Sequence, residues 1–332
     1  MRNVEINSGD NKKKKLLLVI IFLLIFLVFL WFIKFLFSKP EPEWDDDLSQ
    51  DSLNTISYEG KQYSYNNNLM NILFLGIDNT DMLVGNEIPG EAGQSDCIML
   101  LTLDKSKKEA RILQIPRDTM TEVDIYDVAG NYNTTVTEQI ATQYAYSIGG
   151  KSSCLATVKT VSELFYELPI DGYLAMDYSS IAPVNDAIGG VTITIPKDYT
   201  QILPEFKAGA TLKLNGQQAH KYVRWRDTNA SFSNNDRMER QVQYIPAMID
   251  TIRKNMDSNE NYYKVLYPLV EKYMVTDLTE DQVNELVDYN LVTSDIQFLP
   301  GEGKKGEKYE EFYVNDEKLK KMLIETFYIL EK

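Results

Sequence analysis

A short apolar run, Asn71-Ile-Leu-Phe-Leu-Gly-Ile-Asp78, begins at an amide and ends at a carboxylate. Runs of this length, bounded by polar residues, are typical of strands buried inside a sheet. Two more runs follow at residues 97–103 and 110–115, and the polar residues 104–109 between them predict a hairpin turn. Residues 152–168 then carry apolar side chains at helical spacing. The sequence therefore predicts an α/β fold with a central mixed β-sheet flanked by helices.

The second half of the chain continues this alternation of strands and helices. Residues 191–195 alternate as a strand, and Asn215 begins a capped helix. A second helix is expected near Asp236, because Glu239 stands three residues later in the spacing of a capping box. Further elements are predicted from Thr279 (helix), at residues 296–299 (strand) and from Asp316 (helix).

The first part of the chain predicts a membrane anchor. Residues 16–37 are almost entirely apolar, which matches the roughly 20 residues of a membrane-spanning helix. The tail before them, residues 1–15, ends in lysines and is expected to stay in the cytoplasm, so the rest of a single-pass protein lies outside the cell membrane. The polar residues 38–68 are expected to be an extracytoplasmic linker to one domain over residues 69–332. The alternative is a cleaved signal peptide, but the apolar run exceeds the usual ~7–15 residues.

The charge balance argues against a nucleic-acid partner. The chain has 332 residues and a formal net charge of −15, whereas binding to a phosphate backbone requires a broad basic surface. Cys97 and Cys154 lie in the part expected outside the cell, where either a disulfide or two buried free thiols fits the sequence. With these two cysteines and a single histidine, His220, neither a zinc cluster nor a His-dependent catalytic triad is expected.

Four of the eight arginines lie close together in this acidic chain, between residues 224 and 240. A guanidinium is planar, permanently charged and forked, which suits bidentate contact with a carboxylate or a phosphate. Arg237 and Arg240 also fall at the start of a predicted helix, where free backbone N–H groups favour an anion. We therefore expect them to converge with Arg224 and Arg226 on an oxyanion. The alternative is a surface network of ion pairs, which contributes little to stability.

Carboxylates stand at the ends of the predicted strands. Asp78 closes the first strand, Asp96 opens the second, and Arg117-Asp118 follows the third. Ligands of open α/β sheets bind at strand ends, and Mg²⁺ takes one or two carboxylates together with phosphate oxygens. Two aspartates that face several arginines therefore suit a complex of Mg²⁺ with pyrophosphate. Each aspartate taken alone is also consistent with a turn or a helix cap.

Six short motifs occur in order along the chain: Asn71-Ile-Leu-Phe-Leu-Gly-Ile-Asp78, Gln94-Ser-Asp96, Ile115-Pro-Arg117-Asp118, Tyr144-Ala-Tyr146 before Gly149-Gly150, Asp186-Ala-Ile-Gly-Gly-Val191, and Tyr222-Val-Arg-Trp-Arg226 with Arg237-Met-Glu-Arg240-Gln241. Together they resemble the LytR-CpsA-Psr (LCP) family, closely over residues 69–255 and weakly from there to the C-terminus. The resemblance implies a single LCP-like catalytic domain and an extracytoplasmic, Mg²⁺-dependent phosphotransferase in an envelope of the Gram-positive type. Such an enzyme moves a glycopolymer (wall teichoic acid, capsule or a related polysaccharide) from a polyprenyl-pyrophosphate carrier to peptidoglycan.

The resemblance also implies roles for individual residues. Asp78 and Asp96 match the aspartates that bind Mg²⁺ (or Mn²⁺), and catalysis is expected from Asp96 together with arginines 117, 224 and 226. The pyrophosphate-binding set falls on Arg117, Asp118, Arg224, Arg226, Arg237, Arg240 and Gln241.

The chain departs from the family pattern at four positions of this site. An arginine often found soon after the first aspartate is absent from Asn79-Thr80-Asp81. An arginine usual before Ser95 is Gln94 here, and a basic residue usual before the Tyr-Ala-Tyr segment is Gln139. The family's aspartate three residues before the arginine of the last motif falls on Asn234, for which Asp236 is a candidate substitute. These exchanges predict a site that is less positive than usual.

Three functions stay open at this level. In the transferase, a sugar hydroxyl attacks the phosphorus next to the glycan, with Asp96 or Asp118 as candidate proton acceptors. The carrier tail requires an apolar groove. Ile181, Ile188, Ile193 and Leu214 either line this groove or belong to the hydrophobic core. The second function is a pyrophosphatase that uses water on the same carrier. The third is a non-catalytic wall-binding or regulatory membrane protein that keeps the fold.

Overall fold

The computed structural model describes residues 55–79, 88–227, 229–259 and 261–331. The expected cytoplasmic tail, the expected membrane anchor and the first part of the expected linker lie outside these residues. Across the described ranges, no helix combines the length and the apolar character needed to cross a bilayer.

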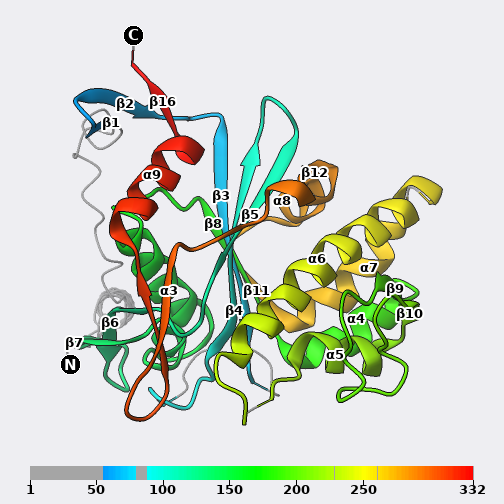
Figure 1. Ribbon diagram of the computed structural model, residues 1–332. Coiled ribbons are helices and arrows are strands. Elements are labelled where there is room, and N and C mark those ends of the chain that lie inside the picture. Colours follow the sequence, from blue (N-terminus) through cyan, green and yellow to red (C-terminus); the bar gives the residue numbers. More distant parts are fainter. Residues whose placement is uncertain (1–54, 80–87, 228, 260, 332) are drawn as a thin grey trace, which may run out of the picture. The chain divides into compact units, whose positions relative to one another are not determined.

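The described residues have a seven-stranded mixed β-sheet at their centre (Figure 1). The three apolar runs form its middle as β3 (Leu69–Ile77), β4 (Ser95–Asp104) and β5 (Glu109–Ile115). β3 pairs antiparallel with β4 and parallel with β8 (Gly172–Asp177), and β4 pairs antiparallel with β5. The expectation of a central mixed sheet is confirmed. The edges are β11 (Met274–Thr276) beside β8, and β12 (Asn290–Leu291) and β13 (Gln297–Phe298) beside β5.

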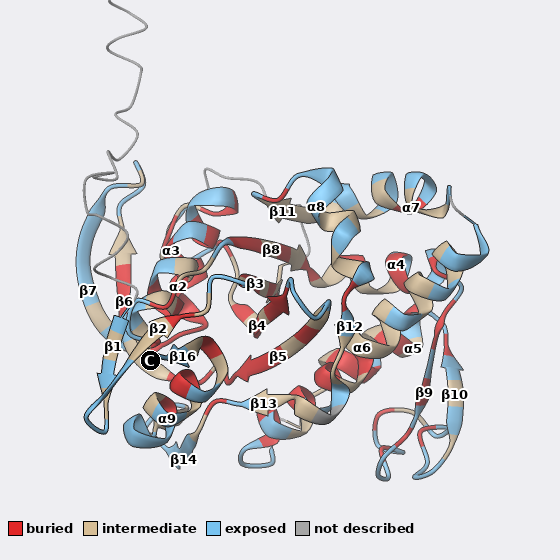
Figure 2. Cartoon of the chain, turned by 90° about the horizontal axis from the view of Figure 1, so that it is seen from above, coloured by how far each residue is buried: buried red, intermediate tan, exposed pale blue. Residues whose placement is uncertain are grey.

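Helices cover both faces of this sheet (Figure 1). One face packs against α3 (Gly150–Leu164) and α9 (Asp316–Phe327), and the other against α6 (Ser233–Ser258). Figure 2 shows that β3, β4, β5 and β8 are mostly buried between these helices. Burial on both faces explains why the middle strands read as continuous apolar runs instead of alternating.

A smaller group of elements packs beside α6 around its own core. The group contains α4 (Ile181–Ala187), β9 (Val191–Thr194), β10 (Thr211–Leu214), α5 (Gly216–Arg224) and α7 (Tyr262–Val270). The strand predicted at residues 191–195 exists, but it pairs with β10 in a separate sheet. Ile188, Ile193 and Leu214 are buried in this core, so these three side chains do not form the groove.

Two hairpins flank the central sheet. They are β6 (Met120–Tyr126) with β7 (Tyr132–Gln139), which leads into α2 (Thr142–Ala145), and β14 (Gly301–Lys305) with β15 (Glu310–Val314). Thr119 forms a parallel bridge with Phe312, whose N–H donates to the Asp118 carbonyl at 2.8 Å. The β14–β15 hairpin is therefore fastened to the chain segment that carries Arg117 and Asp118.

The folded domain begins before residue 69. The sequence predicts a linker up to residue 68, but residues 55–65 contain two strands, and the second pairs with a strand at the C-terminal end. The strands are β1 (Thr55–Tyr58), β2 (Lys61–Tyr65) and β16 (Tyr328–Leu330). Tyr65 is buried and meets Tyr328 edge to face at 5.9 Å. Such aromatic pairs stabilise a sheet.

The observed starts of the helices test the capping signals read from the sequence. Thr279 forms a capping box with Gln282 at the start of α8 (Glu280–Glu285), and Asn215 forms one with Gln218 at the start of α5. The capping box predicted from Asp236 and Glu239 is wrong. α6 begins earlier, at Ser233, after Phe232 in the left-handed region (φ 56°), and both predicted carboxylates bind Lys197 instead.

The two cysteines are free and buried, in β4 and α3. Burial raises the pKa of Cys97 to about 12, so its thiol stays protonated. Of the two alternatives that the sequence allowed, free thiols are correct.

Candidate functional site

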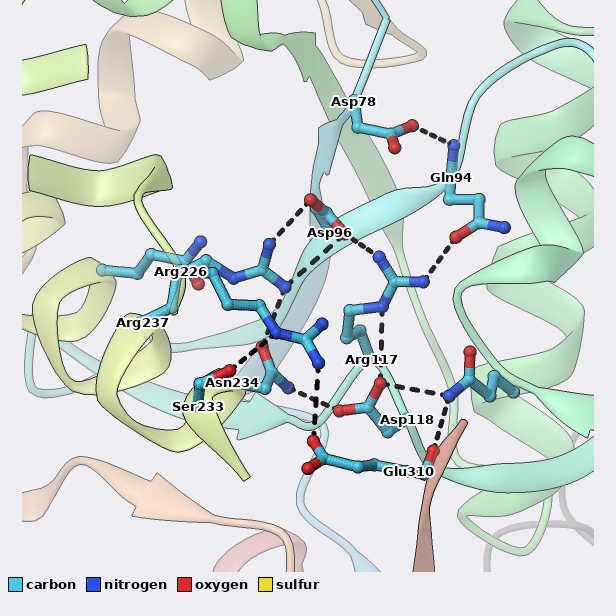
Figure 3. Close-up of polar contacts among 12 residues, drawn as sticks. Asp78, Gln94, Asp96, Arg117, Asp118, Arg226, Ser233, Asn234, Arg237 and Glu310 are labelled. Atoms are coloured by element: carbon cyan, nitrogen blue, oxygen red, sulfur yellow. Dashed lines mark hydrogen bonds and ion pairs between the residues drawn. The ribbon is translucent and has the colours of Figure 1, made fainter. Parts of the chain in front are cut away.

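One end of the central sheet collects the chemistry-bearing residues. Because β3 and β8 are parallel and β4 runs against both of its neighbours, Asp78 after β3, Asp96 in β4 and Arg117 after β5 lie at the same end. Ser95 pairs with Ile77 and Cys97 with Gly76, which leaves Asp96 as the extra residue of a β-bulge. Bulges re-aim side chains, and this one directs Asp96 toward the arginines in Figure 3.

Asp96 joins two arginines from different parts of the chain (Figure 3). Arg237 at the start of α6 donates from Nη1 to Oδ2 of Asp96 at 2.7 Å, and Arg117 donates from Nη1 to Oδ1. The Arg237 and Arg117 side chains are only 5% and 12% exposed, whereas that of Asp96 is 20% exposed. Of the four arginines expected to converge on an oxyanion, only Arg237 binds this carboxylate, and its companion there is Arg117.

Opposing influences act on the pKa of Asp96. Burial by itself raises it, but the charges and hydrogen bonds of Arg237 and Arg117 outweigh burial and hold the pKa below the usual carboxyl range. Burial lowers the pKa of Arg237, and the negative charge of Asp96 partly offsets this lowering. Asp96 is therefore ionised at neutral pH.

Asp118 lies behind Arg117 and is only 7% exposed. It accepts from Gln139 Nε2 at 3.1 Å and from Asn234 Nδ2 at 3.0 Å, and it lies 3.5 Å from Nε of Arg117. Burial raises its pKa despite the nearby arginines. Asp118 is enclosed by these donors and contacts Arg117, and its direct contact with pyrophosphate stays a prediction.

Three of the four departures from the family pattern, Gln94, Gln139 and Asn234, are part of this network. Gln94 accepts from Arg117 through Oε1, and Gln139 and Asn234 both donate to Asp118. Asn234 also accepts from Arg237 Nη2 at 2.8 Å. Asp236 does not substitute for it, because its carboxylate is 42% exposed and pairs with Lys197.

Arg226 is held by a residue that the sequence did not single out. Its Nη2 lies 3.4 Å from Oε2 of Glu310 at the start of β15, and its Nε donates to Ser233 Oγ at 2.9 Å. The other Glu310 oxygen accepts from the Phe232 backbone N–H, and the Glu310 carbonyl accepts from Gln139 at 2.7 Å. No local signal marks Glu310, because its partners are far away along the chain.

Arg240 occupies a different place from the other site arginines. It is 1% exposed and donates to the carbonyls of Tyr222, at 2.6 Å, and Trp225. It thereby fastens the C-terminal end of α5, from which Arg224 and Arg226 project. Direct contact of Arg240 with pyrophosphate stays a prediction.

An apolar pocket opens beside the Asp96 cluster and has about 960 Å³ of empty space, including its open mouth. Its polar lining includes Asp78, Asp96, Arg224, Arg237 and Gln241. Most of the remaining lining consists of apolar side chains from the sheet, α4 and α6, among them Phe74, Ile181, Val184, Ile245, Met248 and Ile252. A charged mouth on an apolar cavity suits a ligand with an anionic head and a hydrocarbon tail.

Two of the residues that line the pocket, Asp78 and Asp96, are the expected ligands of Mg²⁺. Asp78 accepts from the Gln94 backbone N–H, and it lines the same pocket as Asp96. Within the described residues, no group of three or more His, Cys, Asp or Glu side chains is arranged to hold a metal ion. Two carboxylates fit Mg²⁺ only if phosphate oxygens and water complete its ligands, which is the usual mode for this ion.

Comparison with known proteins gives a consistent picture. The model of the LytR_cpsA_psr family matches residues 43–327. The transferase TagV of Bacillus subtilis (strain 168), named a polyisoprenyl-teichoic acid–peptidoglycan teichoic acid transferase, is 34% identical over 203 residues, which are 58% of this chain and 45% of that protein. This chain thus aligns with less than half of TagV. TagU of Bacillus cereus (strain AH820), which is also named a polyisoprenyl-teichoic acid–peptidoglycan teichoic acid transferase, is 29% identical over 71% of this chain and 70% of its own length.

A solved structure agrees with the fold. The crystal structure of B. subtilis TagV covers 78% of this chain and 97% of its own, with 26% identity and a TM-score of 0.57.

Proposed function

Because the chain belongs to the LytR_cpsA_psr family, we propose that it transfers a teichoic acid or a related glycopolymer from a polyprenyl-pyrophosphate carrier to peptidoglycan. The two curated relatives described above are named for this reaction. The observation that carries the proposal is the Asp96–Arg117–Arg237 cluster, whose Asp96 and Arg237 line the apolar pocket. The cluster suits the pyrophosphate and the pocket suits the polyprenyl chain.

The arginines have a direct role in the chemistry. An acceptor hydroxyl of peptidoglycan attacks the phosphorus next to the glycan, a new P–O bond forms, and the bond to the bridging oxygen breaks so that polyprenyl phosphate leaves. Negative charge grows on the bridging and equatorial oxygens. Guanidinium groups fixed at that position stabilise the transition state more than the ground state.

Asp96 is suited to respond to the substrate. In the free protein its pKa is lowered by Arg237 and Arg117 against the effect of burial, which makes it a weak base. A bound pyrophosphate competes for the same guanidinium donors and so releases oxygens of the Asp96 carboxylate. These oxygens are then available for Mg²⁺ or, in the alternative role of Asp96, for the proton of the attacking hydroxyl, whereas Asp118 is enclosed by its own donors.

Magnesium is part of the proposal. Asp78 and Asp96 would hold the ion together with phosphate oxygens, since both line the pocket mouth. When bound, Mg²⁺ neutralises charge on the pyrophosphate. We also propose that residues 16–37 anchor the protein in the cell membrane by a single pass, with the catalytic domain outside, where carrier and peptidoglycan meet.

The test is a reconstituted reaction with the purified full-length protein. A polyprenyl-pyrophosphate oligosaccharide and Mg²⁺ are supplied with or without peptidoglycan fragments, and release of polyprenyl phosphate is followed. Release that requires the acceptor, with glycan appearing on peptidoglycan, supports the transferase. Release without an acceptor identifies a pyrophosphatase, and binding without turnover identifies a non-catalytic protein.

A further inference from the structure

Arg224 is held by a different kind of contact from the other arginines of the site. Its guanidinium carbon lies 3.5 Å from the centre of the Tyr178 ring, and both residues line the pocket. Among the described residues, Arg224 forms no hydrogen bond or ion pair through its guanidinium, whereas Arg117, Arg237 and Arg226 each pair with a carboxylate. Resting on the proposed function, we propose that Tyr178 is a positioning residue that holds Arg224 ready for the carrier pyrophosphate.

A stacked guanidinium is well prepared for an anion. The interaction with the ring uses the face of the guanidinium plane, so its five N–H donors stay available at the edge. An arginine that is paired with a carboxylate must exchange that partner for the phosphate, which costs part of the binding energy. Arg224 keeps its support while it binds. We therefore expect it to contribute more to pyrophosphate affinity than Arg226, whose partner is Glu310.

The structure around Tyr178 fixes the backbone that carries the ring. Tyr178 directly follows β8, and the preceding Asp177 caps the turn by accepting from the Ser180 N–H at 3.2 Å. The turn leads into α4, which packs closely on α5: a side chain at Gly216 would place its Cβ 2.4 Å from the Ala182 carbonyl oxygen. This close contact sets the spacing between the start of α4, next to Tyr178, and α5, which ends at Arg224.

Another role for Tyr178 has to be separated from this one. The ring lines an apolar pocket, so it also has the chemistry to contact the carrier tail. The two roles depend on different features of the protein and of the ligand. Support of Arg224 requires the arginine and a charged head group, whereas contact with the tail requires neither.

The experiment measures equilibrium binding of farnesyl pyrophosphate with Mg²⁺ to the purified full-length protein, with farnesol as the uncharged probe. Tyr178→Leu, which removes the ring, is expected to weaken farnesyl pyrophosphate binding about 3- to 30-fold. Tyr178→Phe, which keeps the ring, is expected to stay within about twofold of the wild type. In the Arg224→Ala background, Tyr178→Leu is expected to have no further effect, because the two residues act as one unit.

Each other outcome has a distinct meaning. Equal weakening by Tyr178→Leu in the presence and absence of Arg224, or an equal loss of farnesol binding, overturns the proposal and assigns Tyr178 to the tail. Unchanged binding in Tyr178→Leu also overturns it. If the wild type binds farnesol but not farnesyl pyrophosphate, the proposed function itself fails. Thermal melting of each variant shows whether the fold is kept.

Discussion

Arg237 Nη1 donates to Asp96 Oδ2 at 2.7 Å and thereby joins the first turn of α6 to the bulge in β4. The two residues are 141 positions apart in the chain. The contact places a carboxylate between two buried guanidinium groups at the position proposed for pyrophosphate. Asp96 is therefore a structural partner of both arginines and, in the proposed function, the group that competes with pyrophosphate for them.

The first prediction concerns stability and pH. Because the pKa of Asp96 is lowered in the folded state, its ionised form stabilises the fold above the ordinary carboxyl pKa of about 3.9, and this contribution is lost as the pH falls through the folded value. Asp96→Asn should therefore lower the free energy of unfolding at pH 7 by about 1–3 kcal/mol. The difference from the wild type should shrink below about pH 4.

Urea unfolding at a series of pH values checks this expectation. Glu307→Gln is the matched control, because Glu307 is exposed and forms no ion pair with another described residue. A difference between wild type and Asp96→Asn that stays constant from pH 7 to about pH 3 would contradict the role of the charge.

The second prediction concerns Glu310. Its carboxylate binds both Arg226 and the Phe232 N–H, so it holds the arginine and the start of α6 together. Glu310→Gln should lower kcat/KM about 5- to 20-fold, because the charge-assisted contact with Arg226 is weakened. The adjacent Glu311→Gln is the control, since Glu311 contacts Tyr313 instead. Equal effects of the two changes would mean that the hairpin, and not the contact with Arg226, matters.

Much of this architecture was predictable from local patterns. The apolar runs that became β3, β4 and β5 stand out because both faces of the sheet are covered, and the polar residues at their ends mark the functional edge. The bulge at Asp96 was not predictable, because a single unpaired residue leaves no periodicity signal. Glu310 was missed because its contact with Arg226 spans 84 residues. Arginine clustering likewise did not distinguish Arg240, which binds backbone carbonyls, from Arg237, which faces the pocket.

The third prediction concerns the two amides on Asp118. Asn234→Asp removes a donor and adds a like charge beside a buried carboxylate, so it should destabilise the protein by about 1–3 kcal/mol. Gln139→Lys adds a cation at the other side of Asp118. The double variant should therefore be more stable than the sum of the single changes predicts. Thermal and urea unfolding of the four proteins measure this coupling, and strictly additive effects would show that the two positions act independently.

The fourth prediction separates the pocket from the arginines. Met248 lines the apolar part of the pocket from α6, so Met248→Trp should fill the space proposed for the carrier tail. Binding of farnesyl pyrophosphate should weaken more than about tenfold, while binding of inorganic pyrophosphate with Mg²⁺ should stay unchanged, because the tail alone loses its site. Lys254→Trp is the control: it places the same residue on the same helix, where the lysine side chain is 73% exposed. An equal loss for both ligands would mean that the tryptophan disturbs the arginines, and no loss for either would remove the pocket as the site of the tail.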